Sequence, residues 1–128
     1  TAMSTILIVE DNEKNMKLVR DILQHKGHAT IEAATGGDGV RLAVERRPDL
    51  VLMDIQLPDI DGIAALRLIR AEAALDAVPV IAVSASVMPD DQHKIVTSGF
   101  DAFITKPINL KQFLDTVQRF LAEGRRRT

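Results

Sequence analysis

Polar or charged residues directly follow four short apolar runs of the sequence, and their chemical types suit phosphoryl transfer. They are three carboxylates, a hydroxyl and an ammonium: Glu10, Asp11, Asp54, Ser84 and Lys106. Phosphoryl transfer needs an aligned nucleophile and positive charge around the equatorial oxygens of the transferred group. We expect Asp54 to be the nucleophile, Lys106 to neutralise those oxygens, and the Ser84 hydroxyl to donate a hydrogen bond to one of them.

The same carboxylates predict a bound divalent cation. Crowded carboxylates repel one another unless protons or a cation compensate, and Mg²⁺ prefers carboxylate, water and phosphate oxygens. The absence of cysteine and of clustered histidine argues against Zn²⁺. We expect Asp11 and Asp54 to bind Mg²⁺ directly, with Mn²⁺ able to substitute. Glu10 is expected to act through a water molecule, and the backbone carbonyl of Gln56 to add one more oxygen.

Two backbone features accompany these residues. The Lys106-Pro107 bond is a candidate cis peptide, because proline narrows the preference for trans to about 0.5–1 kcal/mol. The stretch Gly36-Gly37-Asp38-Gly39 lacks both the Lys-Ser/Thr ending of a phosphate-binding loop and the spacing of a dinucleotide-binding loop. It therefore predicts only the start of a helix.

Five apolar segments of strand type alternate with five segments of helical period. The expected strands are residues 5–9, 29–33, 50–53, 78–83 and 102–105. Strands joined by helices run parallel, and right-handed crossovers then cover both faces of an open sheet. This pattern predicts a doubly wound (βα)₅ α/β sandwich. Ligands bind at the carboxyl edge of such sheets, where the polar residues named above are expected to meet.

Composition limits the function further. A chain of 128 residues with 46% hydrophobic and 27% charged residues fits one globular domain. We expect a tail at 1–4, a domain at 5–123 and a basic tail at 124–128. The net charge of −2 shows no broad basic face for nucleic acid. No apolar run reaches the length of a membrane span, so we expect a cytoplasmic protein that does not bind membranes.

Several motifs together resemble the receiver domains of response regulators, over nearly the whole chain. They are Val9-Glu10-Asp11-Asn12, residues 52–58, Asp61-Gly62, Ser84-Ala85 and Lys106-Pro107-Ile108. The sequence of residues 9–18 and 53–58 is similar in particular to single-domain regulators of the DivK type. The resemblance implies the flavodoxin/CheY-like fold with strand order 2-1-3-4-5, and a role in bacterial two-component phosphorelay signalling.

The resemblance also implies roles for individual residues. Asp54 would be phosphorylated by a histidine kinase or a histidine phosphotransfer protein, with Glu10 and Asp11 holding Mg²⁺. Ser84 and Lys106 would bind the phosphoryl group. The domain would be a signalling switch, monomeric or weakly dimeric, that catalyses only its own phosphorylation and dephosphorylation. Its fourth helix, fifth strand and fifth helix would bind a downstream protein.

Three positions are expected to tune this switch. Phe103 matches the place of an aromatic residue that changes rotamer on activation in the family, together with Ser84, and it lacks the hydroxyl of a tyrosine. Gln56 and Ser86 lie two residues after Asp54 and Ser84, where they are expected to set the lifetime of the phosphoaspartate.

Two alternatives compete with the switch. A small Mg²⁺-dependent phosphohydrolase also attacks with an Asp at a strand end, but that class usually needs an acid two residues later, where this chain has Gln56. An inactive receiver used only for docking is the other alternative, and the complete set of acidic residues argues against it.

Overall fold

The computed structural model describes residues 4–85 and 88–124. The strands are β1 (Thr5–Val9), β2 (Ala29–Ala33), β3 (Leu50–Asp54), β4 (Val80–Ser84) and β5 (Ala102–Thr105). The helices are α1 (Glu13–His25), α2 (Gly36–Arg46), α3 (Gly62–Arg70), α4 (Pro89–Thr97) and α5 (Leu110–Glu123), with a short 3₁₀ helix η1 (Ala73–Leu75). The expected tails fall largely outside the described residues, and Ser86 falls outside them entirely.

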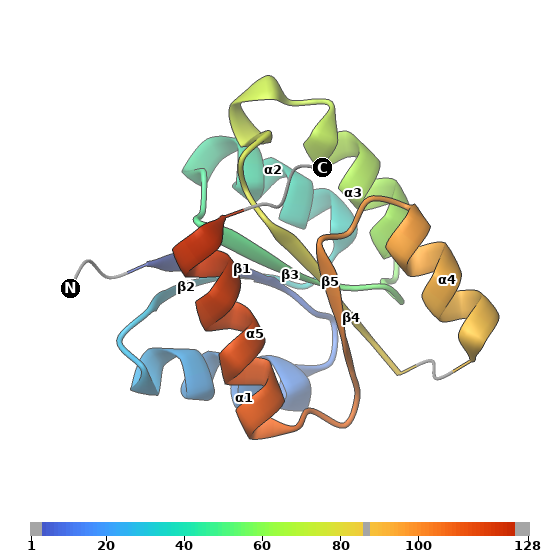
Figure 1. Cartoon of the computed structure of the whole chain (residues 1–128). Coiled ribbons are helices and arrows are strands. Elements are labelled where there is room, and N and C mark those ends of the chain that lie inside the picture. The colour runs from blue at the N-terminus through green and yellow to red at the C-terminus, as the bar shows by residue number, and fades with distance from the viewer. Residues whose placement is uncertain (1–3, 86–87, 125–128) are drawn as a thin grey trace.

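All five strands are parallel and lie in the order β2-β1-β3-β4-β5. Alternate strand residues point to opposite faces, because side chains alternate along a strand. One face packs against α1 and α5, and the other against α2, α3 and α4 (Figure 1). The predicted doubly wound fold is therefore confirmed, including the strand order that the resemblance implied.

Side-chain caps fix where the two helices on the first face begin. The Asn12 side chain accepts hydrogen bonds from the backbone amides of Lys14 and Asn15, at 3.0 and 3.1 Å. The Asn109 side chain accepts one from the Gln112 amide, at 3.0 Å. Such caps satisfy amides that have no partner inside the helix. They set the starts of α1 and α5 just beyond the carboxyl ends of β1 and β5.

The fourth strand begins two residues later than the sequence predicted. The chain before it forms η1, and the amide of Val78 donates to the carbonyl of Leu75 at 3.0 Å rather than to a neighbouring strand. Pro79 has no amide hydrogen for the sheet. Regular strand structure therefore starts at Val80, although Val78 is as apolar as the residues that follow.

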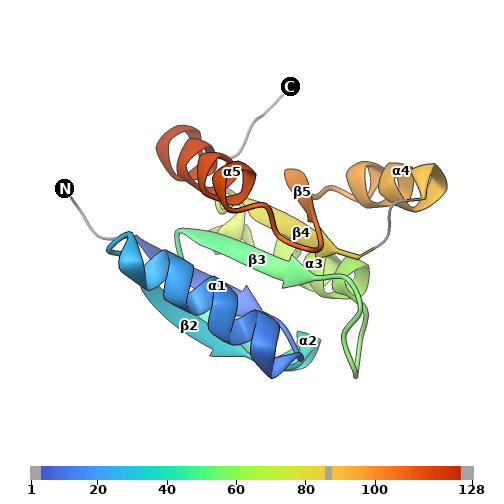
Figure 2. The same cartoon turned by 90° about the horizontal axis from the view of Figure 1, so that it is seen from below.

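The fourth helix lies beside β5 at the margin of the molecule in both views (Figures 1 and 2). Among the α4 side chains that the structure describes, Ile95 is the one buried in the core. Met88, just before the helix, is 62% exposed.

In the described parts of the chain, no helix is long and apolar enough to cross a membrane.

Candidate functional site

The fold brings the predicted site residues to one edge of the sheet. Glu10 follows β1, Asp54 ends β3, Ser84 ends β4 and Lys106 follows β5. The side chains of the first three are buried, whereas Asp11 is exposed. The four strands end at a common level because they are parallel and in register. Residues far apart in the sequence therefore face one shared site.

The Lys106 ammonium joins the two buried carboxylates. Its Nζ lies 2.9 Å from Glu10 Oε1 and 3.1 Å from Asp54 Oδ2. Burial acts to lower the pKa of Lys106, but the hydrogen bonds to Glu10 and Asp54 outweigh it and leave the pKa raised. The lysine is thus firmly protonated and supplies one positive charge to the acids around it.

One ammonium does not balance the acids at this edge. Glu10, Asp11 and Asp54 each bring a carboxylate oxygen within 4.8 Å of the others. Burial and the neighbouring Asp54 raise the pKa of Glu10 to about 7, against the lowering effects of Lys106 and the Asn12 amide. Negative charge is costly here without a further cation or a proton.

The backbone around Asp54 and Lys106 is also arranged toward the site. Asp54 Oδ1 accepts a hydrogen bond from the Gln56 amide at 3.0 Å, while the Gln56 side chain is exposed. The Lys106 amide donates to the Ser84 carbonyl at 2.8 Å. The Lys106-Pro107 peptide bond is cis. The bond between Lys106 and Ser84 ties the ends of β4 and β5 to each other.

Phe103 lies on the face of the sheet that packs against α2, α3 and α4, opposite the face covered by α1 and α5. It is half-buried and packs against the core cluster that includes Ile95 of α4. Phe103 is adjacent to Ala82 of β4 across the sheet, two residues before Ser84. Phe103 thus belongs to the same core cluster as α2, α3 and α4.

Asp59, for which the sequence predicted no role, connects the loop after β3 to the start of α2. Its carboxylate accepts hydrogen bonds from the amides of Gly36 and Gly37, each at 2.8 Å. The pair of glycines was the only signal in the sequence, and it predicts the start of a helix. The structure confirms that start and shows Thr35 as its cap.

The acidic cluster fits a hard divalent cation. Its donors are carboxylate oxygens, and two of the three acids are buried. Burial and the hydrogen bond with Asp54 raise the pKa of Glu10. Mg²⁺ binds such oxygen donors while keeping several water ligands. The chain contains no cysteine, so it offers no thiolate ligand.

Comparisons with known proteins agree with this geometry. The profile of the response regulator receiver domain matches residues 6–118. The polar-differentiation response regulator DivK of Brucella anthropi is 42% identical over 120 residues, which are 94% of this chain and 98% of that protein. Its counterpart in Brucella ovis is 41% identical over the same shares of the two chains.

Solved structures give the same result. The receiver domain of sensor histidine kinase PA1611 from Pseudomonas aeruginosa, which has a magnesium ion coordinated in its active site cleft, is 33% identical with a TM-score of 0.89, covering 95% of this chain and 100% of that one. The receiver domain of a signal transduction histidine kinase from Syntrophus aciditrophicus is 32% identical with a TM-score of 0.87, covering 98% and 95%. Vibrio cholerae CheY4, 24% identical with a TM-score of 0.85 over 92% and 98%, shares the fold. This chain belongs to the receiver domains of two-component response regulators.

Proposed function

We propose that the domain accepts a phosphoryl group on Asp54 from a phosphohistidine of a histidine kinase or phosphotransfer protein. The observation that carries the proposal is the Lys106 ammonium, which lies between the buried carboxylates of Asp54 and Glu10 at a sheet edge. The family match supports it, since receiver domains of response regulators act in phosphorelays. The domain is a cytoplasmic switch that acts by binding other proteins.

In the reaction, one carboxylate oxygen of Asp54 attacks phosphorus. A new oxygen–phosphorus bond forms, the phosphorus–nitrogen bond breaks, and its electron pair stays on the departing imidazole nitrogen. The Lys106 ammonium is 3.1 Å from Asp54 and neutralises charge on the phosphoryl oxygens. The Ser84 hydroxyl donates a hydrogen bond to one of those oxygens.

Glu10, Asp11, Asp54 and the carbonyl of Gln56 hold Mg²⁺, for which Mn²⁺ can substitute. The bound cation supplies positive charge that offsets the crowded carboxylates and the developing charge on the phosphoryl oxygens. The acidic oxygens within 4.8 Å of one another support this assignment. Glu10 would act through a water molecule, since Mg²⁺ usually keeps several waters.

The phosphoryl group changes partner binding by drawing Ser84 inward. Phe103, which packs with the core beside α4, follows by a change in packing, since it has no hydroxyl to bond. The face formed by α4, β5 and α5 then binds its partner differently. A ligand shifts such a two-state equilibrium only through contacts that differ between the states, and Ser84 and Lys106 supply those contacts.

Gln56 and Ser86 set the lifetime of the phosphoaspartate, because they lie two residues after Asp54 and Ser84 in the sequence. Position 56 holds a glutamine, so the chain lacks there the acidic residue that would drive turnover on free substrates. A steady-state phosphatase assay is expected to show no release of phosphate from small esters, and sustained turnover would favour the phosphohydrolase alternative.

The proposal is tested by intact mass after incubation with Mg²⁺ and acetyl phosphate. The expected result is one added phosphoryl group, lost in Asp54→Asn and in EDTA. If acetyl phosphate gives no adduct, a phosphorylated histidine donor is tried next. Failure with both donors would contradict the proposal and favour a docking module.

The switch is tested separately with Ser84→Ala. This change removes the hydroxyl and should uncouple phosphorylation from partner binding while Asp54 still takes the phosphoryl group. Unchanged binding of a phosphorylation-dependent partner would count against the relay.

A further inference from the structure

The loop between β3 and α3, residues 55–61, leaves the phosphorylation site and returns to it. At its two ends, the Gln56 amide donates to Asp54 Oδ1 at 3.0 Å and the Gly62 amide donates to the Ile55 carbonyl at 2.9 Å. Both contacts lie close to Asp54 in the sequence. They leave open what holds the middle of the loop against the rest of the domain.

Asp59, in the middle of the loop, reaches another element altogether. Its Oδ1 accepts from the Gly36 amide and its Oδ2 from the Gly37 amide, each at 2.8 Å, over 23 and 22 residues of sequence. These amides lie in the first turn of α2, where backbone donors have no partner inside the helix and carry partial positive charge. The bonds from Gly37 and Gly36 lower the pKa of Asp59, so its carboxylate stays ionised.

The contact is close as well as polar. A Cβ at position 36 would lie 2.6 Å from Ile60 Cγ1 and 3.1 Å from the Ile60 carbonyl oxygen. A Cβ at position 37 would lie 3.1 Å from Asp59 Oδ2. Glycine at position 36 therefore lets Ile60 of the loop pack closer to α2 than a side chain at that position would allow.

We propose that Asp59 and Gly36 form a clamp that holds the β3–α3 loop against α2 and so positions the Gln56 carbonyl for the cation. Asp59 is a positioning residue in this account, because it acts through Gln56, three residues away. The inference rests on the proposed function, in which Gln56 contributes an oxygen to the Mg²⁺ site. It goes beyond that function by giving a role to residues on the other side of the loop.

The physical reason is the strict geometry of Mg²⁺. The ion requires near-octahedral ligands at about 2.0–2.1 Å, and a freely moving loop must lose conformational entropy before its carbonyl meets that requirement. The clamp removes that freedom before the cation binds. Loss of groups that orient metal ligands typically lowers affinity by about 10-fold to 100-fold. We expect the lower end, because Gln56 is one ligand among several.

The test measures Mg²⁺ affinity by isothermal titration for the wild type, Asp59→Ala and Asp38→Ala. Asp38 is an exposed acid in the same first turn of α2, and its carboxylate lies 3.5 Å from Arg41. The control therefore removes the same charge without touching the loop. The dissociation constant for Mg²⁺ is expected to rise about 10-fold in Asp59→Ala and to stay unchanged in Asp38→Ala.

Amide hydrogen exchange provides a readout that does not depend on the cation. In EDTA, the Gly36 and Gly37 amides should exchange faster in Asp59→Ala than in Asp38→Ala. The steric half of the clamp is tested by Gly36→Ala, which should weaken Mg²⁺ binding, and by adding Ile60→Ala, which removes the atom at 2.6 Å and should restore part of the affinity. If Asp59→Ala does not fold, Asp59→Asn retains one acceptor and should give an intermediate affinity.

The outcomes separate the clamp from the proposed function. If the wild type binds Mg²⁺ and Asp59→Ala binds it equally well, the clamp alone would be overturned. The same conclusion would follow if Asp59→Ala lost thermal stability in EDTA but kept the wild-type affinity for Mg²⁺. A wild-type protein that binds no Mg²⁺ would overturn the proposed function, and the clamp's role with it. An equal loss of affinity in Asp38→Ala would attribute the effect to general charge and would also overturn the clamp.

Discussion

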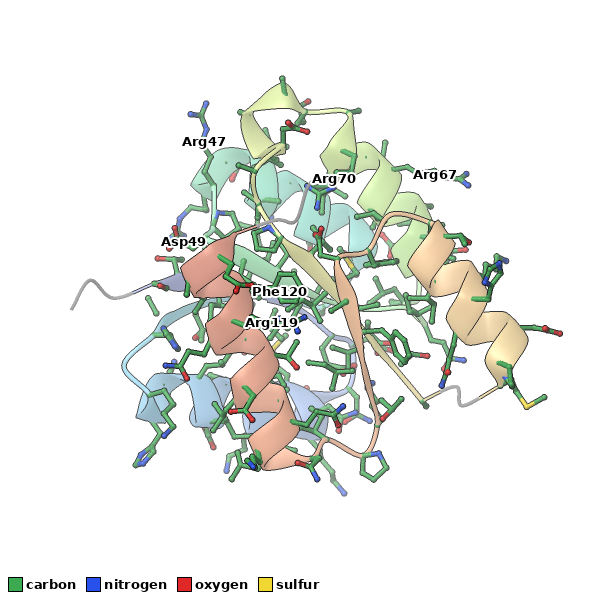
Figure 3. All side chains as sticks on the ribbon, in the orientation of Figure 1. Arg47, Asp49, Arg67, Arg70, Arg119 and Phe120 are labelled. Atoms are coloured by element: carbon green, nitrogen blue, oxygen red, sulfur yellow. The ribbon has the colours of Figure 1, made fainter. Side chains whose placement is uncertain are left out.

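The carboxyl edge of the sheet holds buried acids in excess of bases, whereas the amino edge pairs a buried acid with a base. At the carboxyl edge, Glu10 and Asp54 share one ammonium, that of Lys106, and the pKa of Glu10 is raised to about 7. At the amino edge, Asp101 Oδ2 lies 3.0 Å from an Arg70 nitrogen. Figure 3 shows Arg70 at the end of α3, near the start of the last two strands.

The amino-edge pair also binds the backbone. Asp101 accepts a hydrogen bond from the Val80 amide at 2.8 Å, at the first residue of β4. Arg70 donates to the Leu75 carbonyl at 3.0 Å. The pair thus links α3, η1 and β4 with its charges matched. A buried ion pair with added hydrogen bonds of this kind holds structure together.

Buried charge therefore has two different roles in this domain. Matched charge at the amino edge fixes the packing of neighbouring elements. Unmatched negative charge at the carboxyl edge favours the binding of a cation. Function is therefore expected where compensation is incomplete, and stability where it is complete.

The sharpest test of the carboxyl edge is Asp54→Asn. The change should abolish the phosphoryl adduct entirely, yet the free energy of unfolding in EDTA should stay the same or rise. The physical reason is that the Asp54 carboxylate raises the pKa of Glu10, so its removal relieves crowding while Lys106 keeps Glu10 as a partner. Urea unfolding beside intact mass measures both. A large loss of stability would mean that this edge is structural like the other.

The matching test of the amino edge is Asp101→Ala. Removing one member of a buried ion pair costs about 3 kcal/mol, because the remaining charge loses its compensation. The side chains of Arg70 and Asp101 are only 17% and 6% exposed, so solvent screening is small. Folded protein should still be phosphorylated at the wild-type rate. Asp101→Asn, which keeps an acceptor for Val80, is the milder control.

Mg²⁺ should stabilise the carboxyl edge alone. At a concentration 100 times its dissociation constant, a cation that binds only the folded state adds about 2.7 kcal/mol to the free energy of unfolding. The increase should appear in the wild type and in Asp101→Asn, and disappear in Asp11→Asn and Asp54→Asn. Thermal unfolding with and without EDTA measures it. Equal stabilisation of all four proteins would indicate nonspecific binding elsewhere.

An exposed contact at the amino edge should matter least. The Asp49 carboxylate accepts a hydrogen bond from the Thr5 amide at 2.7 Å, and Figure 3 shows Asp49 at the surface. Its replacement in Asp49→Ala should lower stability by about 1 kcal/mol or less, because water can replace the lost partner. A loss as large as that of Asp101→Ala would show that burial does not distinguish the two contacts.

The sequence predicted the parts of the molecule that depend on local pattern and on topology. Apolar runs ending in polar residues located the strands and the acidic edge, because parallel strands bring their carboxyl ends together. The site residues Glu10, Asp54, Ser84 and Lys106 could therefore be assembled without coordinates.

The remaining features depend on tertiary contacts that leave little trace in the sequence. The contact of Asp59 with Gly36 joins residues 23 apart through backbone amides, which every non-proline residue possesses. Arg70 and Asp101 are 31 residues apart. Nothing in the sequence distinguishes either residue from the charged residues of the surface. The later start of β4 depended on where Val78 found its hydrogen-bond partner.

The most direct test of the central claim is to locate the phosphoryl group after transfer from a phosphohistidine donor. Borohydride converts an acyl phosphate to an alcohol, so phosphorylated Asp54 would appear as homoserine in peptide mass spectra. Homoserine is expected at position 54 when Mg²⁺ is present, both in the wild type and in Asp101→Asn. A phosphoryl group found on another residue, or transfer to Asp54 that is unaffected by EDTA, would contradict it.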